Sequence, residues 1–285
     1  MKAPLNNNPI TPFIRWAGGK QKLINRLLKF IPADFNERTY KEPFLGAGSL
    51  FFYLQPQNAF LSDANSHLIN CYVYIKKDPQ LIHTYLQQHL SKTNKEYYYK
   101  IRDLYNRSVP TAAQAARFIY LNKTCFNGIF RVNLKNQFNV PYGYKEPPVI
   151  PSQSQLNAVH LALQTSVLCS QSFEKTTNNL SSNDFIYLDP PYPPINGTSY
   201  FTHYTKERFG EKDQKALSTY VNELNKTGAK FMMSNADIPL MRDLYKKYNI
   251  YDLSVTRCIT CKTKKHKVSE LVITNYDNFI LLGEG

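Results

Sequence analysis

A glycine-rich turn between a strand and a helix places the strongest constraint on how this chain folds. Gly46 and Gly48 follow an extended stretch and precede an apolar helical pattern over Ser49–Leu54. A second short strand, Ala59–Ser62, then ends on Asp63. This order predicts a β-α-β unit whose ligand binds at the carboxyl ends of the strands.

The same alternation of strands and helices resumes in the second half of the chain. After two further elements, an apolar strand over 184–188 is followed by helical and extended patterns up to about residue 274. Between the two halves lie three polar, Tyr-rich helical patterns and a hairpin-like stretch, Ile129–Tyr144. We therefore predict an α/β fold with one open, Rossmann-like sheet and an inserted, mainly helical lobe with a hairpin. The expected division is a discontinuous sheet domain of residues 12–78 and 151–276, an insert of residues 79–150 and an N-terminal tail of residues 1–11.

Charge indicates what the insert contacts. The chain has 35 Lys and Arg residues against 21 Asp and Glu residues, a formal net charge of +14. Residues 80–150 hold ten of the basic residues and three of the acidic ones, which is half of the excess in a quarter of the chain. An excess of this size favours a nucleic acid or an anionic membrane face as partner. Because the chain lacks an apolar run of about 18 residues, we expect no membrane-spanning helix.

The glycine turn favours a nucleoside ligand that has no pyrophosphate. A dinucleotide fingerprint needs a third glycine where this chain has Phe51, and the Gly-Lys-Ser/Thr of a phosphate loop is absent. Asp63 lies 15 residues after Gly48. At the end of the second strand, its carboxylate can accept hydrogen bonds from both ribose hydroxyls. An ordinary tight turn with a helix cap is the alternative interpretation.

The sequence Asp189-Pro190-Pro191-Tyr192 after the apolar strand carries a second chemical signal. An aromatic amine is a weak nucleophile because its lone pair is delocalised into the ring. The Asp189 carboxylate and the Pro190 carbonyl oxygen could each accept one N–H of such an amine, while Tyr192 stacks on the base. This arrangement would act through positioning and electrostatics, with no covalent intermediate.

The cysteines give little support for a metal site. There are five, an odd number scattered along the chain, which suits a reduced, cytoplasmic compartment. Cys258 and Cys261 form a lone C-x-x-C, and His266 is the one further candidate ligand nearby. A structural zinc site needs four ligands, so we expect no metal.

Together, four separated motifs resemble the Dam-type DNA adenine methyltransferases of the alpha (D12) class. They are Arg15-Trp16-Ala17-Gly18-Gly19-Lys20, Glu42-Pro43-Phe44-Leu45-Gly46-Ala47-Gly48, Asp63 with Asn65, and Asp189-Pro190-Pro191-Tyr192. Within the insert, Leu121-Asn122, the segment Phe126–Asn133 and the segment Phe138–Gly143 resemble that family's target-recognition hairpin. The resemblance extends from about Phe13 to Tyr276 and implies a class I methyltransferase fold.

The resemblance implies S-adenosyl-L-methionine as methyl donor, S-adenosyl-L-homocysteine as product, and a bacterial-type, DNA-associated enzyme. Trp16 and Lys20 would close over the donor, and Asp63 would hold its ribose. The segment from Glu42 to Gly48, including Phe44 and Gly46, would lie under its methionine portion. Ser172 and Phe173 would flank its adenine. Asp189 would contact both the donor and the target amine, with Pro190 and Tyr192 completing the catalytic set.

The resemblance also implies double-stranded DNA as substrate, with the target adenine flipped out of the duplex. Arg131 is expected to read a guanine through a bidentate contact, a phosphate contact being the alternative. The remaining DNA-binding residues implied are Phe126, Asn127, Ile129, Pro141 and Tyr144. The family often has an Arg before the Tyr in the stretch after Gly143, and this chain passes directly to Tyr144. The expected recognition site is GATC or another site containing GA. The expected enzyme is a monomer. A cognate restriction endonuclease could belong to the same system without making stable contact with it.

Three other functions compete with this interpretation. A cytosine N4-methyltransferase and an RNA or protein amino-methyltransferase use related chemistry, with Ser or Asn favoured at the position of Asp189. A non-catalytic DNA-binding module is expected to have lost at least one of Asp63, Asp189 and Tyr192, all of which are present.

Overall fold

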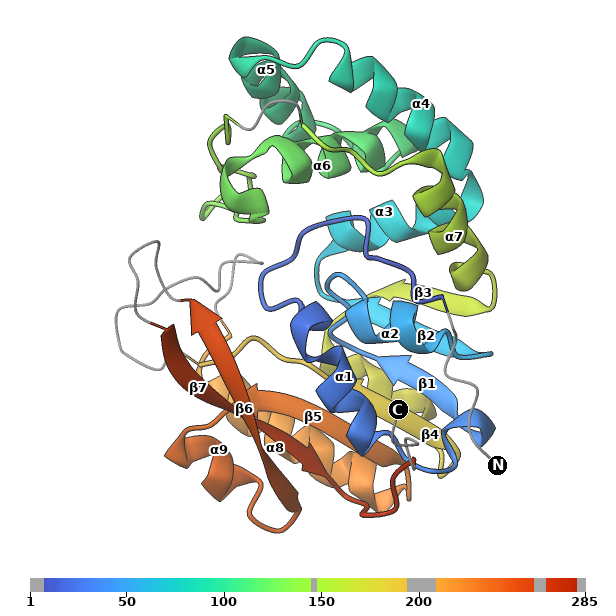
Figure 1. The fold of residues 1–285 in the computed structure, drawn as a ribbon, viewed down its shortest axis with the longest axis vertical. Coiled ribbons are helices and arrows are strands. Elements are labelled where there is room, and N and C mark those ends of the chain that lie inside the picture. Colours follow the sequence, from blue (N-terminus) through green and yellow to red (C-terminus); the bar gives the residue numbers. More distant parts are fainter. Residues whose placement is uncertain (1–7, 145–147, 194–208, 259–264, 281–285) are drawn as a thin grey trace.

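Seven strands form a single mixed sheet in the computed structural model, which describes residues 8–144, 148–193, 209–258 and 265–280 (Figure 1). The strand order is β3-β2-β1-β4-β5-β7-β6, in which β7 runs antiparallel to both of its neighbours and the other pairs are parallel. The strands are β1 (Thr39–Glu42), β2 (Ala59–Asp63), β3 (Ser166–Ser170), β4 (Asp184–Leu188), β5 (Lys230–Ala236), β6 (Asn249–Cys258) and β7 (Lys265–Thr274). The order 3-2-1-4-5 is that of a doubly wound sheet, so the predicted Rossmann-like fold is confirmed.

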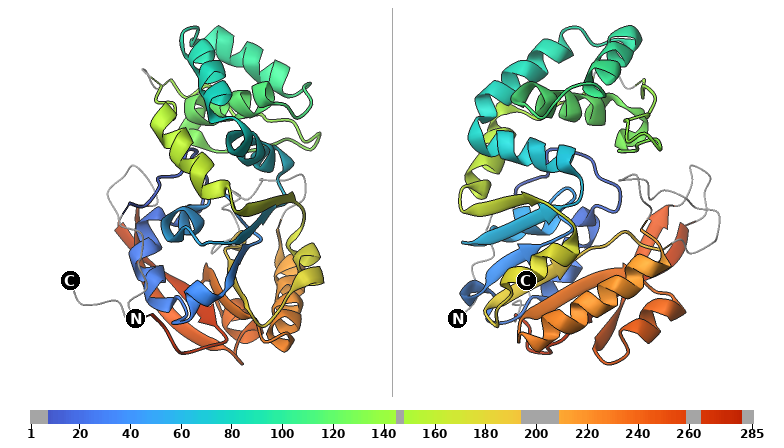
Figure 2. Two further views of the ribbon diagram at one scale, coloured as in Figure 1. Left: turned by 90° about the vertical axis from the view of Figure 1, so that its right-hand side faces the viewer. Right: turned by 180° about the vertical axis from the view of Figure 1, so that it is seen from behind.

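Helices cover both faces of this sheet. Figure 2 shows α1 and α2 on one face and α8 on the other. The α-helices are α1 (Ile24–Leu27), α2 (Ser49–Leu54), α3 (Ser66–Lys77), α4 (Pro79–Leu90), α5 (Lys95–Tyr105), α6 (Ala112–Thr124), α7 (Gln153–Leu163), α8 (Glu211–Lys226) and α9 (Pro239–Leu244). Short 3-10 turns are η1 (Lys20–Leu23), η2 (Leu28–Phe30), η3 (Phe35–Glu37), η4 (Phe126–Gly128) and η5 (Phe173–Asn179). None of the helices in the described ranges combines the length and the apolar character that a bilayer crossing needs.

Strand β4 shows why the central strands read as apolar runs. All five of its residues are buried. Phe185 and Tyr187 belong to the hydrophobic core on one face, and Ile186 and Leu188 to the core on the other. Successive side chains of a strand point to opposite faces, so a strand covered on both sides must be apolar at every position.

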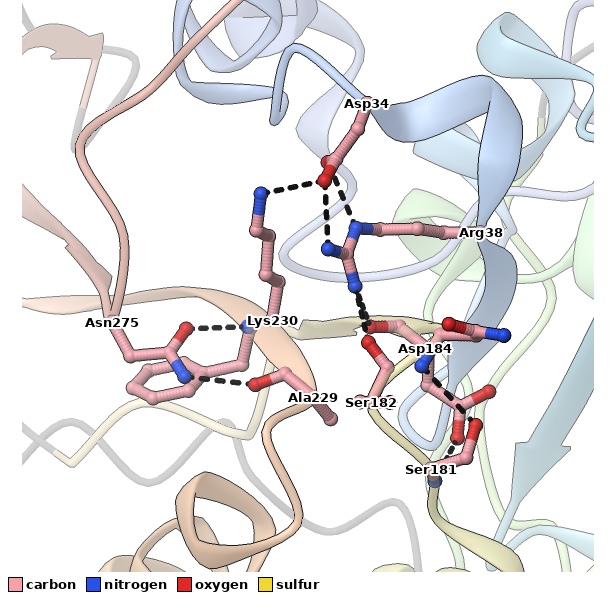
Figure 3. A network of polar contacts seen from close by, with 10 residues as sticks. Asp34, Arg38, Ser181, Ser182, Asp184, Ala229, Lys230 and Asn275 are labelled. Atoms are coloured by element: carbon pink, nitrogen blue, oxygen red, sulfur yellow. Dashed lines mark hydrogen bonds and ion pairs between the residues drawn. The ribbon is translucent and has the colours of Figure 1, made fainter.

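A polar network ties together the amino ends of the central strands, at the edge opposite their carboxyl ends (Figure 3). Arg38 forms a bidentate pair with Asp34, at 2.8 and 2.7 Å, and also donates to the Ser182 carbonyl. Lys230 Nζ, at the start of β5, lies 2.8 Å from Asp34 Oδ2. The Arg38 guanidinium holds the pKa of Asp34 well below its usual range. This network fixes the amino ends of β1, β4 and β5, which lie at the edge of the sheet opposite the candidate site.

The inserted residues form a helical lobe beside the sheet (Figure 1). Its helices begin at side-chain caps, because Asp78, Asn94 and Thr111 each accept a hydrogen bond from the first turn of α4, α5 or α6. The three helical patterns that the sequence predicted here are α4, α5 and α6 in the structure. Helices α3 and α7 flank the insert and pack on both the lobe and the sheet. The division at residues 79 and 150 stays a prediction.

The expected hairpin exists in a reduced form. Its two arms share one isolated bridge, Val132↔Phe138, in place of a ladder. Helix α5 takes the place of the missing partner strand. Asn106 binds both backbone groups of Phe138, at 2.8 and 3.0 Å, and the Tyr98 hydroxyl donates to the Val140 carbonyl. Side chains of α5 and of Asn106, the residue after it, thus satisfy backbone groups of Phe138 and Val140 that the prediction assigned to strand pairing.

Candidate active site

The carboxyl ends of β1, β2 and β4 open into one pocket with a volume of about 550 Å³. It contains all the residues that the sequence predicted for the donor and for the chemistry. They are Trp16, Lys20, Glu42, Phe44, Gly46, Gly48, Asp63, Ser172, Phe173, Asp189, Pro190 and Tyr192. Strand ends of this kind are where doubly wound sheets bind their ligands.

The glycine turn forms the floor of the pocket. Gly46 has φ +47° and Gly48 has φ +65°, conformations that side chains rarely adopt. A Cβ at Gly46 would lie 2.8 Å from Cδ1 of Trp16. The Tyr72 hydroxyl donates to the Gly46 carbonyl at 2.9 Å and holds the turn from below. Glycine is therefore required at residue 46 both by the backbone angle and by the close approach of the Trp16 ring.

Asp63 has acceptor capacity left for a ligand. Its Oδ2 accepts from the Gly46 N–H at 3.0 Å and its Oδ1 from the Asn65 N–H at 2.8 Å. A carboxylate has about four lone-pair sites, so two remain for hydroxyl donors. Burial raises the pKa of Asp63 to about 6, against the effect of these two hydrogen bonds. The group is ionised at pH 7 and becomes neutral in mild acid.

Glu42, at the end of β1, is more deeply buried, with 2% of its surface exposed. It accepts a hydrogen bond from the Tyr40 hydroxyl at 2.8 Å. Burial raises the pKa of Glu42 well above its usual value, and the nearby Asp189 and Asp63 carboxylates raise it further. Five acidic residues line the pocket against one basic residue, Lys20, which favours a ligand that carries positive charge; they are Glu42, Asp63, Glu174, Asp189 and Asp213.

An aromatic pair forms another wall. The rings of Phe44 and Phe173 are stacked, with centroids 5.3 Å apart and an interplanar angle of 28°. Ser172 accepts from the Glu174 N–H and donates to its carboxylate, which fixes the start of η5. A flat apolar surface beside polar groups suits a heterocyclic base.

Asp189 is held by two side chains at the end of β4. Lys20 Nζ lies 2.7 Å from its Oδ1, and the Ser234 hydroxyl donates to the same oxygen at 2.9 Å. Burial raises the pKa of Asp189, and both Lys20 and Ser234 act against that rise. The lysine side chain is itself 4% exposed, so this is a buried ion pair. Sequence reasoning placed Lys20 over the donor and did not foresee this contact with Asp189.

Tyr192 presents its ring to the same lysine. Lys20 Nζ lies 4.5 Å from the ring centroid, at cation–π distance. The Tyr192 hydroxyl donates to Glu270 Oε2 at 2.8 Å. Burial, together with the Asp189 and Glu270 carboxylates, raises the pKa of Tyr192 well above its usual value. The phenol therefore stays neutral across the physiological range.

The residues predicted to contact DNA gather on the segment after α6. The Phe126 N–H donates to the Pro141 carbonyl at 2.9 Å, which joins the two arms of the segment. The Phe126 side chain is 52% exposed and the Tyr144 side chain 66% exposed. Arg131 is exposed, and its Nε donates to Asn139 Oδ1 at 2.8 Å. Ile129 instead packs against the hydrophobic core, and Asn127 has φ +54° at an exposed turn.

Asn122 connects this segment to the pocket, a role that sequence reasoning did not assign. Its amide accepts from the Arg15 N–H at 2.9 Å and donates to the Arg15 carbonyl at 2.8 Å and the Gly128 carbonyl at 3.2 Å. One residue further on, the Trp16 ring stacks on Phe130 with centroids 5.6 Å apart. The pocket wall and the recognition segment therefore share a packed boundary.

Within the described residues, no three His, Cys, Asp or Glu side chains gather as a metal-ligand set. Cys261 lies outside those residues, as do the side chains of Cys258 and His266.

The sheet order and an acidic, aromatic pocket at the strand ends are the features expected of a Rossmann-like methyltransferase. The family model of D12 class N6 adenine-specific DNA methyltransferases matches residues 16–259, and the chain belongs to that family. The chain is therefore an enzyme that methylates the 6-amino group of adenine in DNA, and the family implies S-adenosyl-L-methionine as donor.

Named relatives cover almost the whole chain. Type II methyltransferase M1.LlaDCHI of Lactococcus lactis is 39% identical over 280 residues, covering 96% of this chain and 98% of the relative. Type II methyltransferase M.MjaIII of Methanocaldococcus jannaschii is 38% identical over 288 residues, with 94% and 99% covered. A DNA adenine methylase of Vibrio cholerae is 34% identical over 264 residues, with 91% and 94% covered.

Proposed function

We propose that this methyltransferase modifies adenine within GATC, or another site containing GA, in duplex DNA. The target base is flipped out of the duplex, because its amine cannot reach a pocket at the sheet edge from within the stack. The observation that carries the proposal is the position of Asp189 and Tyr192 in one pocket with the glycine turn and Asp63.

Asp189 and Pro190 act as acceptors for the target amine. Two hydrogen bonds, one to the carboxylate and one to the carbonyl, draw electron density toward the nitrogen and orient it. Asp189 must be ionised to serve, and Lys20 and Ser234 support that state by lowering its pKa. The residues act by position and charge, and the amine loses its proton only after methyl transfer has made the nitrogen cationic and acidic, so a strong general base is not required.

In the free protein, Lys20 occupies the Asp189 carboxylate that would accept the target amine. Its ammonium occupies Asp189 Oδ1 and lies against the Tyr192 ring, where a flipped adenine would stack. The target amine therefore takes the place of the ammonium on Asp189, while the Ser234 hydroxyl still donates to the same carboxylate. Leaving a buried charge unpaired would be strongly unfavourable.

The pocket fits the donor that the family implies. Asp63 has acceptor sites left for ribose hydroxyls, the Phe44–Phe173 pair and Ser172 can flank an adenine, and Glu42 can hold a cationic amino group. Trp16 and Lys20 close the pocket on the insert side, above the turn that contains Gly46 and Gly48. When bound, the donor supplies a methyl group on a positively charged sulfur.

DNA is held by the insert of residues 79–150, which is the DNA-recognition unit in our proposal, with residues 12–78 and 151–276 as the donor-binding unit. Arg131 reads a guanine, because its bond from Nε to Asn139 sets the plane of the guanidinium and bidentate recognition uses the terminal nitrogens. Phe126 and Asn127, which are exposed, reach bases or wedge into the stack, while Ile129 packs against the hydrophobic core beside them. Pro141 and Tyr144 contact the outer part of the site. The enzyme acts as a monomer in the cytoplasm, without a metal and without stable contact with any cognate endonuclease.

Methylation of a random-sequence plasmid, mapped by single-molecule sequencing, tests the proposal. We expect N6-methyladenine in GATC, with the inner GA required. Modification confined to adenines outside GA contexts would overturn the specificity. An Arg131→Ala control that leaves the modified set unchanged would overturn the role of Arg131.

A further inference from the structure

Glu270 is a buried carboxylate that supports the catalytic segment from outside the pocket. It lies in β7 opposite Ala236 of β5 and Leu253 of β6, with 1% of its surface exposed. It is not among the residues that line the pocket. Its Oε2 accepts the hydrogen bond from the Tyr192 hydroxyl at 2.8 Å. A carboxyl group is rarely buried in the middle of a sheet unless a specific partner compensates its desolvation.

The bond to Glu270 fixes the far end of the Tyr192 side chain. The ring is attached to the backbone through two rotatable bonds, so the backbone alone does not set the direction of its face. A hydrogen bond at the hydroxyl adds a second point of attachment, at 2.8 Å to the carboxylate of a buried side chain of β7. The face held in this way is the one that Lys20 Nζ approaches to 4.5 Å from the ring centroid.

The backbone before Tyr192 is held from the same part of the sheet. Gln214 of α8 donates to the Pro191 carbonyl at 3.0 Å and accepts from Asn235 Nδ2 at 3.3 Å. Asn235 in turn accepts from the N–H of Ala236, the residue opposite Glu270. Gln214 and Asn235 are fully buried. Two separate side-chain contacts, one through Glu270 and one through Gln214, thus connect the catalytic segment to the place where Ala236 of β5 and Glu270 of β7 lie opposite each other.

We propose that Glu270 is a positioning residue for methyl transfer, which holds the Tyr192 ring in the orientation that stacks on the target adenine. The inference rests on the proposed stacking of the target on Tyr192. Glu270 touches neither substrate, and it acts through the Tyr192 hydroxyl. It therefore sets the orientation of the bound base and contributes little to donor affinity or to the grip on the DNA backbone.

A double-mutant cycle between Glu270→Leu and Tyr192→Phe tests this role. Each variant removes one end of the hydrogen bond and keeps the approximate volume. We expect either change alone to lower kcat by about tenfold to a hundredfold, the range for a hydrogen bond to a charged group. In the Tyr192→Phe background, Glu270→Leu should change kcat by no more than about twofold, because the shared bond is already lost. Glu270→Gln retains an acceptor oxygen and should stay within about threefold of wild type.

A binding measurement separates this inference from the proposed function. The probe is a duplex with 2-aminopurine at the target adenine, and its fluorescence is recorded without donor. Stacking on the Tyr192 ring should quench the 2-aminopurine fluorescence. We expect Tyr192→Ala to remove this quenching fully, and Glu270→Leu and Tyr192→Phe to reduce it to the same intermediate level. No change in Tyr192→Ala would overturn the proposed stacking. A change in Tyr192→Ala with wild-type fluorescence in Glu270→Leu would overturn the role of Glu270 alone.

The cycle also excludes a merely structural role. Independent effects that multiply in the double variant would overturn the inference, as would a Glu270→Leu defect confined to thermal stability with kcat unchanged. The expected result is a loss in kcat with the KM for donor unchanged and with rescue by Glu270→Gln.

Discussion

Replacing Lys20 with methionine should move the acid limb of the activity profile to higher pH. In the free protein the Lys20 ammonium lies 2.7 Å from Asp189 Oδ1, and it is the largest influence that opposes the effect of burial on the Asp189 pKa. Two unit charges at that distance attract by about 1.5 kcal/mol in bulk water and by about 6 kcal/mol at an effective dielectric constant of about 20. The Asp189 side chain is 18% exposed, so the true value lies between these limits. Even the lower limit corresponds to about one pKa unit.

The sign follows from the proposed role of Asp189. Removal of the ammonium favours the neutral carboxyl group and raises the pKa of Asp189, while the amine needs the ionised form. The acid limb of kcat/KM for DNA, which reports the free enzyme in which Lys20 pairs with Asp189, should therefore move upward by at least about one pH unit. The free energy of unfolding of the variant should also fall as pH rises through the raised folded-state pKa, because the folded state then releases a proton that the unfolded state has already lost.

Lys22→Met is the matched control for this experiment, because Lys22 is exposed on the same 3-10 turn. Its pH profile should match that of wild type. An acid limb that stays in place in Lys20→Met would refute the electrostatic role assigned to Lys20, whatever the loss of rate.

Three further changes probe other contacts. In wild type, the donor affinity measured by calorimetry should fall by up to about tenfold per pH unit below pH 6, because the Asp63 carboxylate, the proposed ribose acceptor, has a pKa of about 6 and becomes neutral in acid. Asp63→Asn should abolish this pH dependence. The same pH dependence in the variant would contradict that assignment. Asn122→Ala should lower the free energy of unfolding by about 1–3 kcal/mol, since it removes the partners of both Arg15 backbone groups; an unchanged denaturation midpoint would show that the amide contributes nothing. Arg131→Ala should cost about 1–3 kcal/mol at one base pair, whereas Lys135→Ala, an exposed cation on the same turn, should weaken binding equally on all sequences. If Arg131→Ala weakened binding equally on all sequences, as Lys135→Ala is expected to do, Arg131 would be a phosphate contact.

Sequence pattern was sufficient where the local chemistry has few solutions. The positive φ of Gly46 and Gly48 follows from a turn that no larger residue tolerates, and the apolar run of β4 follows from burial on both faces. In the structure, cap residues such as Asp78 begin the helices because their side chains satisfy the first free N–H groups. These features depend on neighbours in the chain.

Contacts between distant segments could not be predicted in the same way. Glu270 is one of several polar residues in β7, and its partner Tyr192 lies 78 residues away. Asn122 and Arg15 are 107 residues apart. The hairpin was predicted as a strand pair because its sequence does not reveal that Asn106, the residue after α5, binds the backbone of Phe138. For Ser234 the sequence does offer a signal of its contact with Asp189, because Ser234 is a polar residue near the carboxyl end of β5.

The most direct test of the central claim is nucleoside mass spectrometry of duplex DNA after incubation with S-adenosyl-L-methionine and either the wild-type enzyme or Asp189→Ala. The account predicts N6-methyladenine as the sole new nucleoside with wild type. With Asp189→Ala it predicts none, while DNA binding stays within a few-fold of wild type. N6-methyladenine formed by the variant, or N4-methylcytosine formed by the wild type, would contradict the assignment of Asp189 as the acceptor for an adenine amine.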